Sequence, residues 1–142
     1  MYNCINILVQ STFEGDEMAW DLKSDRPIYT QLVEQIQLMV VSGVFPAGGK
    51  LPSVRDLAAQ ASVNPNTMQR ALSQLERDGL LFSQRTSGRF VTEDVRKIMK
   101  TKNSLAEGLI RDFMRQMTRL GFDGDQTVEL LSRMTKEEGQ NG

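Results

Sequence analysis

The segment from Ser62 to Gln74 constrains the fold more than any other part of this chain of 142 residues. Asn64 suits an N-cap, because its side-chain oxygen can accept a hydrogen bond from the free backbone amides of a first helical turn. Pro65 then takes the first helical position, where a missing N–H costs nothing. Apolar residues follow at helical spacing and predict a buried stripe made of Met68, Ala71, Leu72 and Leu75.

The other side of this helix is polar. The residues left pointing outward are Asn66, Gln69, Arg70, Ser73 and Arg77. The capping pattern Ser53-Val54-Arg55-Asp56 opens a short preceding helix with its own apolar residues. With a tight turn between them, the two helices form a predicted helix-turn-helix. Its second helix is sized to enter the major groove of DNA with the N-terminal residues leading.

The rest of this region predicts one more helix and a β-hairpin. A helix is expected from Pro27 to about Ser42, with Gly43 as its C′ cap. Lys50-Leu51-Pro52 is expected to form a very short edge strand. The recognition helix should end near Asp78, with Gly79 as its cap, and two short strands should follow over 80–85 and 89–92, joined by Thr86-Ser87-Gly88. The predicted fold class is therefore mainly α with a small β-wing, a winged helix-turn-helix domain.

Beyond Glu93 the pattern predicts a short C-terminal helical hairpin. The final helix is expected from Thr127 to about Glu138, with Val128, Leu131 and Met134 inward. So small an antiparallel pair seldom buries enough apolar surface to stand alone. The favoured partner is the same pair in a second copy, since two-fold homodimers are the commonest oligomers; the alternative is that the pair folds back on its own winged domain. The residues predicted for dimerisation are Leu105, Leu109, Phe113, Met117, Leu120, Val128 and Leu131.

These patterns divide the chain into three parts. Residues 1–17 are interpreted as a leader, added or misassigned from an upstream start codon, with a genuine extra strand as the alternative. Residues 18–92 are the predicted DNA-binding domain. Residues 93–142 are the predicted dimerisation or effector tail.

Composition excludes several function classes. There is no histidine and one cysteine, so we expect no metal site, no internal disulfide and no histidine general base. No nucleophile–base pair or phosphate loop is present, and we predict neither an enzyme nor a cofactor. No apolar run approaches the ~20 residues of a membrane span, and the first residues lack a secretory pattern. We therefore expect a cytoplasmic protein without a membrane partner.

Charge is unevenly distributed along the chain. The net charge is −1, yet residues 50–100 hold nine basic and five acidic side chains. A local basic surface can meet phosphates even when the whole chain is nearly neutral. A solvated charge mixture is an equally good reading of charge alone.

Several ordered motifs resemble the GntR-type regulator domain: residues 43–58, 63–72, 75–81, and a wing that ends at 87–91. The resemblance covers about residues 21–92. Val63-Asn64-Pro65-Asn66-Thr67 with a short helical tail is similar to the YtrA-type branch. The resemblance implies a bacterial transcription factor, usually a repressor, that binds an inverted repeat of double-stranded DNA as a homodimer. Genes for members of that branch often lie beside operons for transporters of the ATP-binding-cassette kind.

The resemblance also implies which residues meet DNA, and elementary chemistry suggests how. Arg55 would donate a bidentate pair to guanine or a phosphate, unless it is an exposed arginine paired with a neighbouring acid. Asn66 and Gln69 could each read adenine, or make phosphate or water contacts. Pro65 and Gln69 stand where other branches carry arginine, so another branch's operator sequence does not transfer.

The remaining predicted contacts would contribute to DNA affinity more than to recognition of the DNA sequence. Thr67 and Ser53 offer hydroxyls and first-turn amides to phosphates. Arg85 and Arg89 would touch the backbone or the minor groove. Arg70 is either a DNA contact or a structural surface residue. The full predicted DNA-binding set is Ser53, Arg55, Asn64, Asn66, Thr67, Gln69, Arg70, Arg85, Ser87, Gly88 and Arg89.

Two questions stay open at this point. A winged-helix module that binds a partner protein without touching DNA is the alternative function. Either a small-molecule effector binds between subunits, or regulation needs none.

Overall fold

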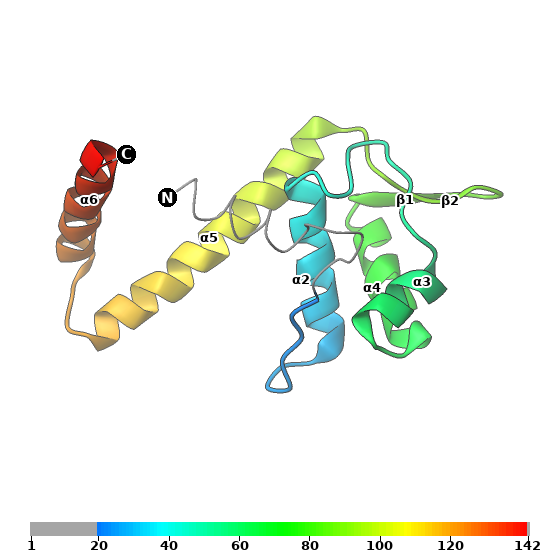
Figure 1. The fold of residues 1–142 in the computed structure, drawn as a ribbon, viewed down its shortest axis with the longest axis horizontal. Helices are drawn as coiled ribbons and strands as arrows, with labels where there is room; N and C mark the ends of the chain where they lie inside the picture. Colours follow the sequence, from blue (N-terminus) through cyan, green and yellow to red (C-terminus); the bar gives the residue numbers. More distant parts are fainter. Residues whose placement is uncertain (1–19, 142) are drawn as a thin grey trace.

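The computed structural model describes residues 20–141, so the leader predicted over 1–17 lies outside the described residues. Its elements are α2 (Ile28–Val41), α3 (Val54–Ala61), α4 (Pro65–Arg77), β1 (Leu81–Gln84), β2 (Gly88–Val91), α5 (Val95–Arg119) and α6 (Gly124–Asn141). In Figure 1, α2, α3, α4 and the hairpin gather at one end, while α5 runs past α2 and leads to α6 at the other end. The predicted fold class, mainly α with a small β-wing, is confirmed.

The core forms where the sequence predicted it. Met68, Ala71, Leu72 and Leu75 of α4 are each at most 1% exposed. Leu32 and Ile36 of α2 are fully buried in the same cluster. Each such large apolar side chain contributes ~1.5–3 kcal/mol by leaving water. Burial of this stripe fixes the rotation of α4 about its axis, and with it the side that faces solvent.

A buried amide that the apolar periodicity did not predict joins α2 to the preceding chain. Gln31 is 2% exposed. Its Oε1 accepts from the Lys23 amide at 2.6 Å, and its Nε2 donates to the carbonyls of Lys23 at 2.6 Å and Arg26 at 2.9 Å. A buried amide is tolerated when it is paired in this way. Helix α2 begins one residue after Pro27, which is its N-cap and does not lie within the first turn as predicted.

The two wing strands pair antiparallel, with Ser83 opposite Arg89 and Gln84 opposite Gly88. The connecting turn therefore spans 85–87, and the prediction that Gly88 belongs to the turn is wrong. Gly88 pairs within β2 with φ 109°, a conformation that L side chains rarely adopt. The predicted edge strand at Lys50 is reduced to a single bridge with Phe90.

Helix α6 begins three residues earlier than predicted. The Asp123 side chain accepts from the Gln126 amide at 2.8 Å, and the Gln126 side chain accepts from the Asp123 amide at 2.9 Å. This reciprocal arrangement is a capping box built from Asp and Gln. Gly124 is the first residue of this helix, directly after the cap at Asp123.

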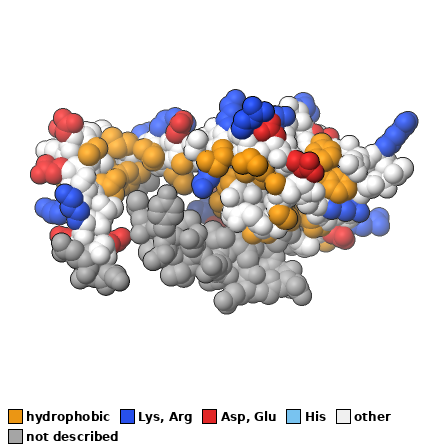
Figure 2. Space-filling model, turned by 90° about the horizontal axis from the view of Figure 1, so that it is seen from above, with side chains coloured by type: hydrophobic (Ala, Val, Ile, Leu, Met, Phe, Trp, Pro, Cys, Tyr) orange, Lys and Arg blue, Asp and Glu red, His pale blue; other side chains and the backbone are white. Residues whose placement is uncertain are grey.

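The tail leaves its apolar residues uncovered in the single chain. Helix α5 has no fully buried residue, and Val128, Leu131 and Met134 of α6 are 61%, 40% and 51% exposed. The prediction that these three point inward is wrong within one chain, because α6 meets α5 near the connecting turn and then diverges from it (Figure 1). Figure 2 shows the resulting hydrophobic surface at this end of the molecule.

Candidate nucleic-acid interface

The start of α4 presents polar side chains on a rigid support. The Asn64 Oδ1 accepts from the Asn66 amide at 2.8 Å, and Pro65 follows at the first helical position, as predicted. Asn66 and Gln69 are exposed, while Thr67 is half-buried. The Gln69 amide donates to the Ser73 hydroxyl at 3.3 Å. The cap and the buried stripe together aim the first turn of α4 at solvent.

Helix α3 carries Arg55 in its first turn. The Ser53 hydroxyl accepts from the Asp56 amide at 3.1 Å, which makes Ser53 the N-cap. Arg55 is exposed, and among residues 20–141 its guanidinium has no ion pair or hydrogen bond. Its five donors remain available for an external acceptor. The alternative of a pairing with a neighbouring acid has no support in this geometry.

Arg70 has a partner within the fold. Its guanidinium carbon lies 4.3 Å from the centre of the Tyr29 ring. The Tyr29 hydroxyl in turn donates to Gln74 Oε1 at 3.1 Å. The face of an aromatic ring attracts a cation that lies over it. This contact supports the structural role for Arg70 that the sequence left as an alternative.

The two arginines of the wing have different surroundings. Arg85, with Ser87, lies in the exposed turn, and Figure 2 shows a basic side chain projecting at the wing end of the molecule. Arg89 is only 17% exposed at its side chain, and its Nε donates to Glu76 Oε1 at 2.6 Å. Glu76 also accepts from the Ser83 hydroxyl. The last turn of α4 therefore holds a cross-strand pair of the wing.

Glu76 was not identified from the sequence. Burial alone would raise the pKa of its carboxyl, but the hydrogen bonds from Ser83 and Arg89 and the charge of Arg89 together hold that pKa below its ordinary value. The carboxylate is thus ionised at neutral pH and keeps Arg89 on the fold. No local pattern could indicate this role, because it depends on the register that sets Ser83 opposite Arg89.

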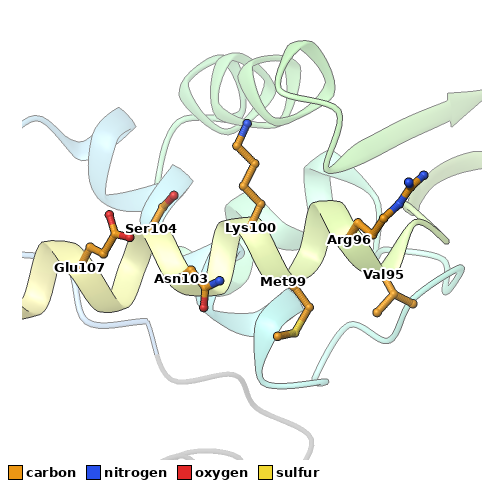
Figure 3. Close-up of a pocket in the computed structure, with 7 residues that line it drawn as sticks. All are labelled: Val95, Arg96, Met99, Lys100, Asn103, Ser104 and Glu107. Atoms are coloured by element: carbon orange, nitrogen blue, oxygen red, sulfur yellow. The ribbon is translucent and has the colours of Figure 1, made fainter.

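One hollow of the molecule lies away from this surface. It is a shallow recess of about 550 Å³ along α5, and Figure 3 shows that its side chains come from one helix, with Lys100 pointing away from Val95 and Met99. Within the described residues, no group of three or more His, Cys, Asp or Glu could hold a metal ion. No helix in that part of the chain is long and apolar enough to cross a membrane.

Comparison with known families and curated proteins gives consistent matches. A family model described as "Bacterial regulatory proteins, gntR family" matches residues 28–91. The HTH-type transcriptional regulator YhcF of Bacillus subtilis (strain 168) is 36% identical over 114 residues, 80% of this chain and 94% of the relative. The HTH-type transcriptional repressor YtrA of the same organism is 35% identical over 120 residues, 82% of this chain and 88% of the relative. These relatives are transcriptional regulators, not enzymes.

Solved structures agree with the architecture. A GntR family transcriptional regulator from Listeria monocytogenes has a TM-score of 0.72 and 36% identity, and the match covers 79% of this chain and 98% of the other. A transcriptional regulator from Oenococcus oeni has a TM-score of 0.65 and 30% identity, covering 82% and 98%. Both similarities extend past the wing, since residues 20–92 alone could not reach such coverage.

Proposed function

Because the chain belongs to the gntR family of bacterial regulatory proteins, within its YtrA-like branch, and is a DNA-binding transcriptional regulator, we propose that it is a repressor that binds an inverted-repeat operator as a homodimer. Residues 18–92 are the proposed DNA-binding domain and 93–142 the proposed dimerisation tail. The chain has no enzymatic role in this proposal, and it acts in the cytoplasm, where the bacterial chromosome lies.

The observation that carries the proposal is the polar first turn of α4. Asn64, Asn66 and Gln69 stand exposed on a helix whose opposite face is fully buried. Side-chain amides can pair with the edge of adenine in the major groove, and the unpaired Arg55 of α3 can pair with guanine or a phosphate. In this proposal Ser53, Thr67, Arg85, Ser87 and Gly88 contribute contacts to the DNA backbone. Arg70 and Arg89 are expected to contribute least, since Tyr29 and Glu76 hold them.

The uncovered tail supports the homodimer. Leu109 of α5 and Leu120, its C-cap, are 69% and 72% exposed, and Val128 of α6 is 61% exposed. Contiguous apolar surface of this kind is rare on a monomer and is the usual material of an interface. A second copy would cover the face with its own equivalent under two-fold symmetry. The two recognition helices would then enter successive major grooves ~34 Å apart, matching the symmetry of an inverted repeat.

Regulation would act on the spacing or mobility of the two DNA-binding units. The similarity to a protein named as a repressor supports negative control, and the branch suggests a transporter operon as the target. A small-molecule effector, if the protein uses one, would bind between subunits, because the recess on α5 is shallow and open. With or without an effector, the proposed DNA contacts lie on α3, α4 and the wing.

Selection of bound duplexes from a random-sequence library tests the proposal. The chain should enrich an inverted repeat, and its affinity for that repeat should fall steeply between two salt concentrations, as phosphate-driven binding does. A scrambled duplex of the same composition is the control. Enrichment of no sequence, with no salt-dependent binding to either duplex, would favour a winged module that contacts a partner protein.

A further inference from the structure

A groove lies between the wing and the chain that leads into α3. It has a volume of about 820 Å³ and is lined on one side by residues 50–54 with Asp56 and on the other by 83–89. Three of its lining residues are cationic, Lys50, Arg85 and Arg89, and one, Asp56, is acidic. Arg85 and Arg89 lie on the wing side of the groove, and Lys50 lies on the side that leads into α3.

Part of this positive charge is neutralised within the fold, because Arg89 pairs with Glu76. Its Nε donates to Glu76 Oε1 at 2.6 Å, and its side chain is mostly buried. Moving the guanidinium to an external phosphate would leave the Glu76 carboxylate with only the Ser83 hydroxyl as partner. Such a loss is costly for a partly buried charge. The cations that can turn to a ligand in the groove without giving up a partner in the described fold are therefore Lys50 and Arg85.

The position of Lys50 depends on Gly88. Lys50 bridges Phe90, and the backbone bond from the Leu51 amide to the Arg89 carbonyl, 2.9 Å long, holds the segment along the outer edge of β2. A Cβ placed on Gly88 would lie 3.2 Å from Lys50 Cε and 4.0 Å from its Nζ. The lysine stem thus crosses the bare backbone of Gly88. Lys50 is exposed, and within the described part of the chain its ammonium has no hydrogen-bond or ion-pair partner.

In the proposed complex, a DNA backbone would pass close to this groove. If α4 enters the major groove and the wing approaches the neighbouring minor groove, a sugar–phosphate backbone passes between them. Lys50 lines the groove between the wing and the chain that leads into α3, three residues before the N-cap Ser53. We propose that Lys50 binds a backbone phosphate of the operator in this groove, and that Arg89 does not. This inference rests on the proposed DNA-binding function.

The test compares how binding depends on salt in single variants. Binding of the full chain to a fluorescein-labelled duplex from the library selection, and to its scrambled counterpart, is measured by anisotropy over a salt series. Each phosphate contact contributes ~0.9 to the slope of log K against log salt. Lys50→Ala should make this negative slope less steep by ~0.9 for each DNA-binding unit engaged. Lys50→Arg should keep the wild-type slope.

Two further variants serve as matched controls. Lys136→Ala removes the same charge from α6, at the far end of the molecule, and should leave the slope unchanged; Lys136 lies about 140° around the helix from Leu131. Arg89→Met, which keeps the apolar stem, should lower the melting temperature and leave the slope unchanged. Because Lys50 is exposed and unpaired, Lys50→Ala should melt at the wild-type temperature.

The possible failures are distinguishable. A wild-type slope for Lys50→Ala, with binding otherwise intact, would overturn the inference while leaving the proposed function standing. A lowered slope for Arg89→Met would show that Arg89 also reaches a phosphate and would overturn the second half of the proposal. Absence of salt-dependent binding by the wild-type chain would instead remove the proposed function itself.

Discussion

Asn64 combines a structural requirement with a candidate role in recognition. Its Oδ1 caps α4 by accepting from the Asn66 amide, and the side chain stays exposed at the helix end expected to lead into DNA. Both facts follow from local sequence, because capping depends on residues within one turn. Arg55 was equally accessible to sequence reasoning, since the preceding cap at Ser53 fixes its place in the first turn of α3. Only the structure could show that no residue in 20–141 pairs with its guanidinium.

Substitutions at Asn64 separate the two roles. Asn64→Ala should lower the free energy of unfolding by ~1 kcal/mol, because the cap is lost. Asn64→Asp should keep the stability, since aspartate caps equally well, but weaken DNA binding through repulsion of phosphates. Urea unfolding and anisotropy measure the two effects. Wild-type affinity in Asn64→Asp would mean that this side chain does not face DNA.

At Arg55, removal of the guanidinium should affect binding and leave the fold intact. Arg55→Ala should weaken binding to the selected duplex by ~1–3 kcal/mol, since a base or phosphate loses a charged partner. The melting temperature should not change, because no residue in 20–141 pairs with this side chain. Arg133→Ala, exposed on α6, is the control. An unchanged affinity would remove Arg55 from the interface.

Among the elements, the features predicted best from the sequence are those that depend on residues close together in the chain. The stripe and both caps of the helix-turn-helix were predicted, because they repeat at short spacing along one helix. The start of α6 was missed by three residues, since its cap uses Asp123 and Gln126 in a pattern weaker than the usual serine and glutamate. The role of Arg89 was not predictable at all. It depends on contacts between α4 and the wing that are distant in sequence.

The bond between α4 and the wing should give stability that depends on pH. Since the pKa of Glu76 is lower in the fold than in the unfolded chain, its ionised form stabilises the fold at neutral pH, and that contribution is lost as pH falls through the folded-state pKa. Glu76→Gln should therefore lower the free energy of unfolding by ~1–3 kcal/mol at neutral pH, with a difference from wild type that shrinks on acidification.

Urea unfolding of wild type and Glu76→Gln at about pH 7 and at about pH 3 measures this difference. Glu137→Gln on the distant α6, where the side chain is exposed, is a control for the general effect of removing one carboxylate from the chain. A difference of equal size at both pH values would contradict the assignment of an ionised Glu76 to the wing.

At the scale of the whole molecule, the proposed DNA contacts and the proposed dimer interface lie at opposite ends. One end carries α3, α4 and the wing, and the other carries apolar side chains that residues 20–141 leave exposed (Figure 2). The sequence predicted the apolar spacing of the tail but also assumed that α6 would bury its own face. That assumption failed because α6 touches α5 only near their connecting turn. In our proposal the second copy supplies the missing cover.

A charge on the apolar face should therefore separate the subunits. Phe113→Asp should shift sedimentation from dimer to monomer, since an aspartate would be buried without a partner. DNA affinity should fall with it. Ser104→Asp adds the same charge nine residues away, on the opposite side of α5, and should remain dimeric. A dimeric Phe113→Asp would show that the interface lies elsewhere.

The number of chains on one operator tests the account most directly. Native mass spectrometry of the saturated complex with the selected inverted repeat should find two chains on each duplex, and a duplex that carries a single half-site should bind far more weakly. The spacing of the two protected half-sites should correspond to one helical turn or a multiple of it. One chain per duplex at saturation, with equal affinity for the single half-site, would contradict the account.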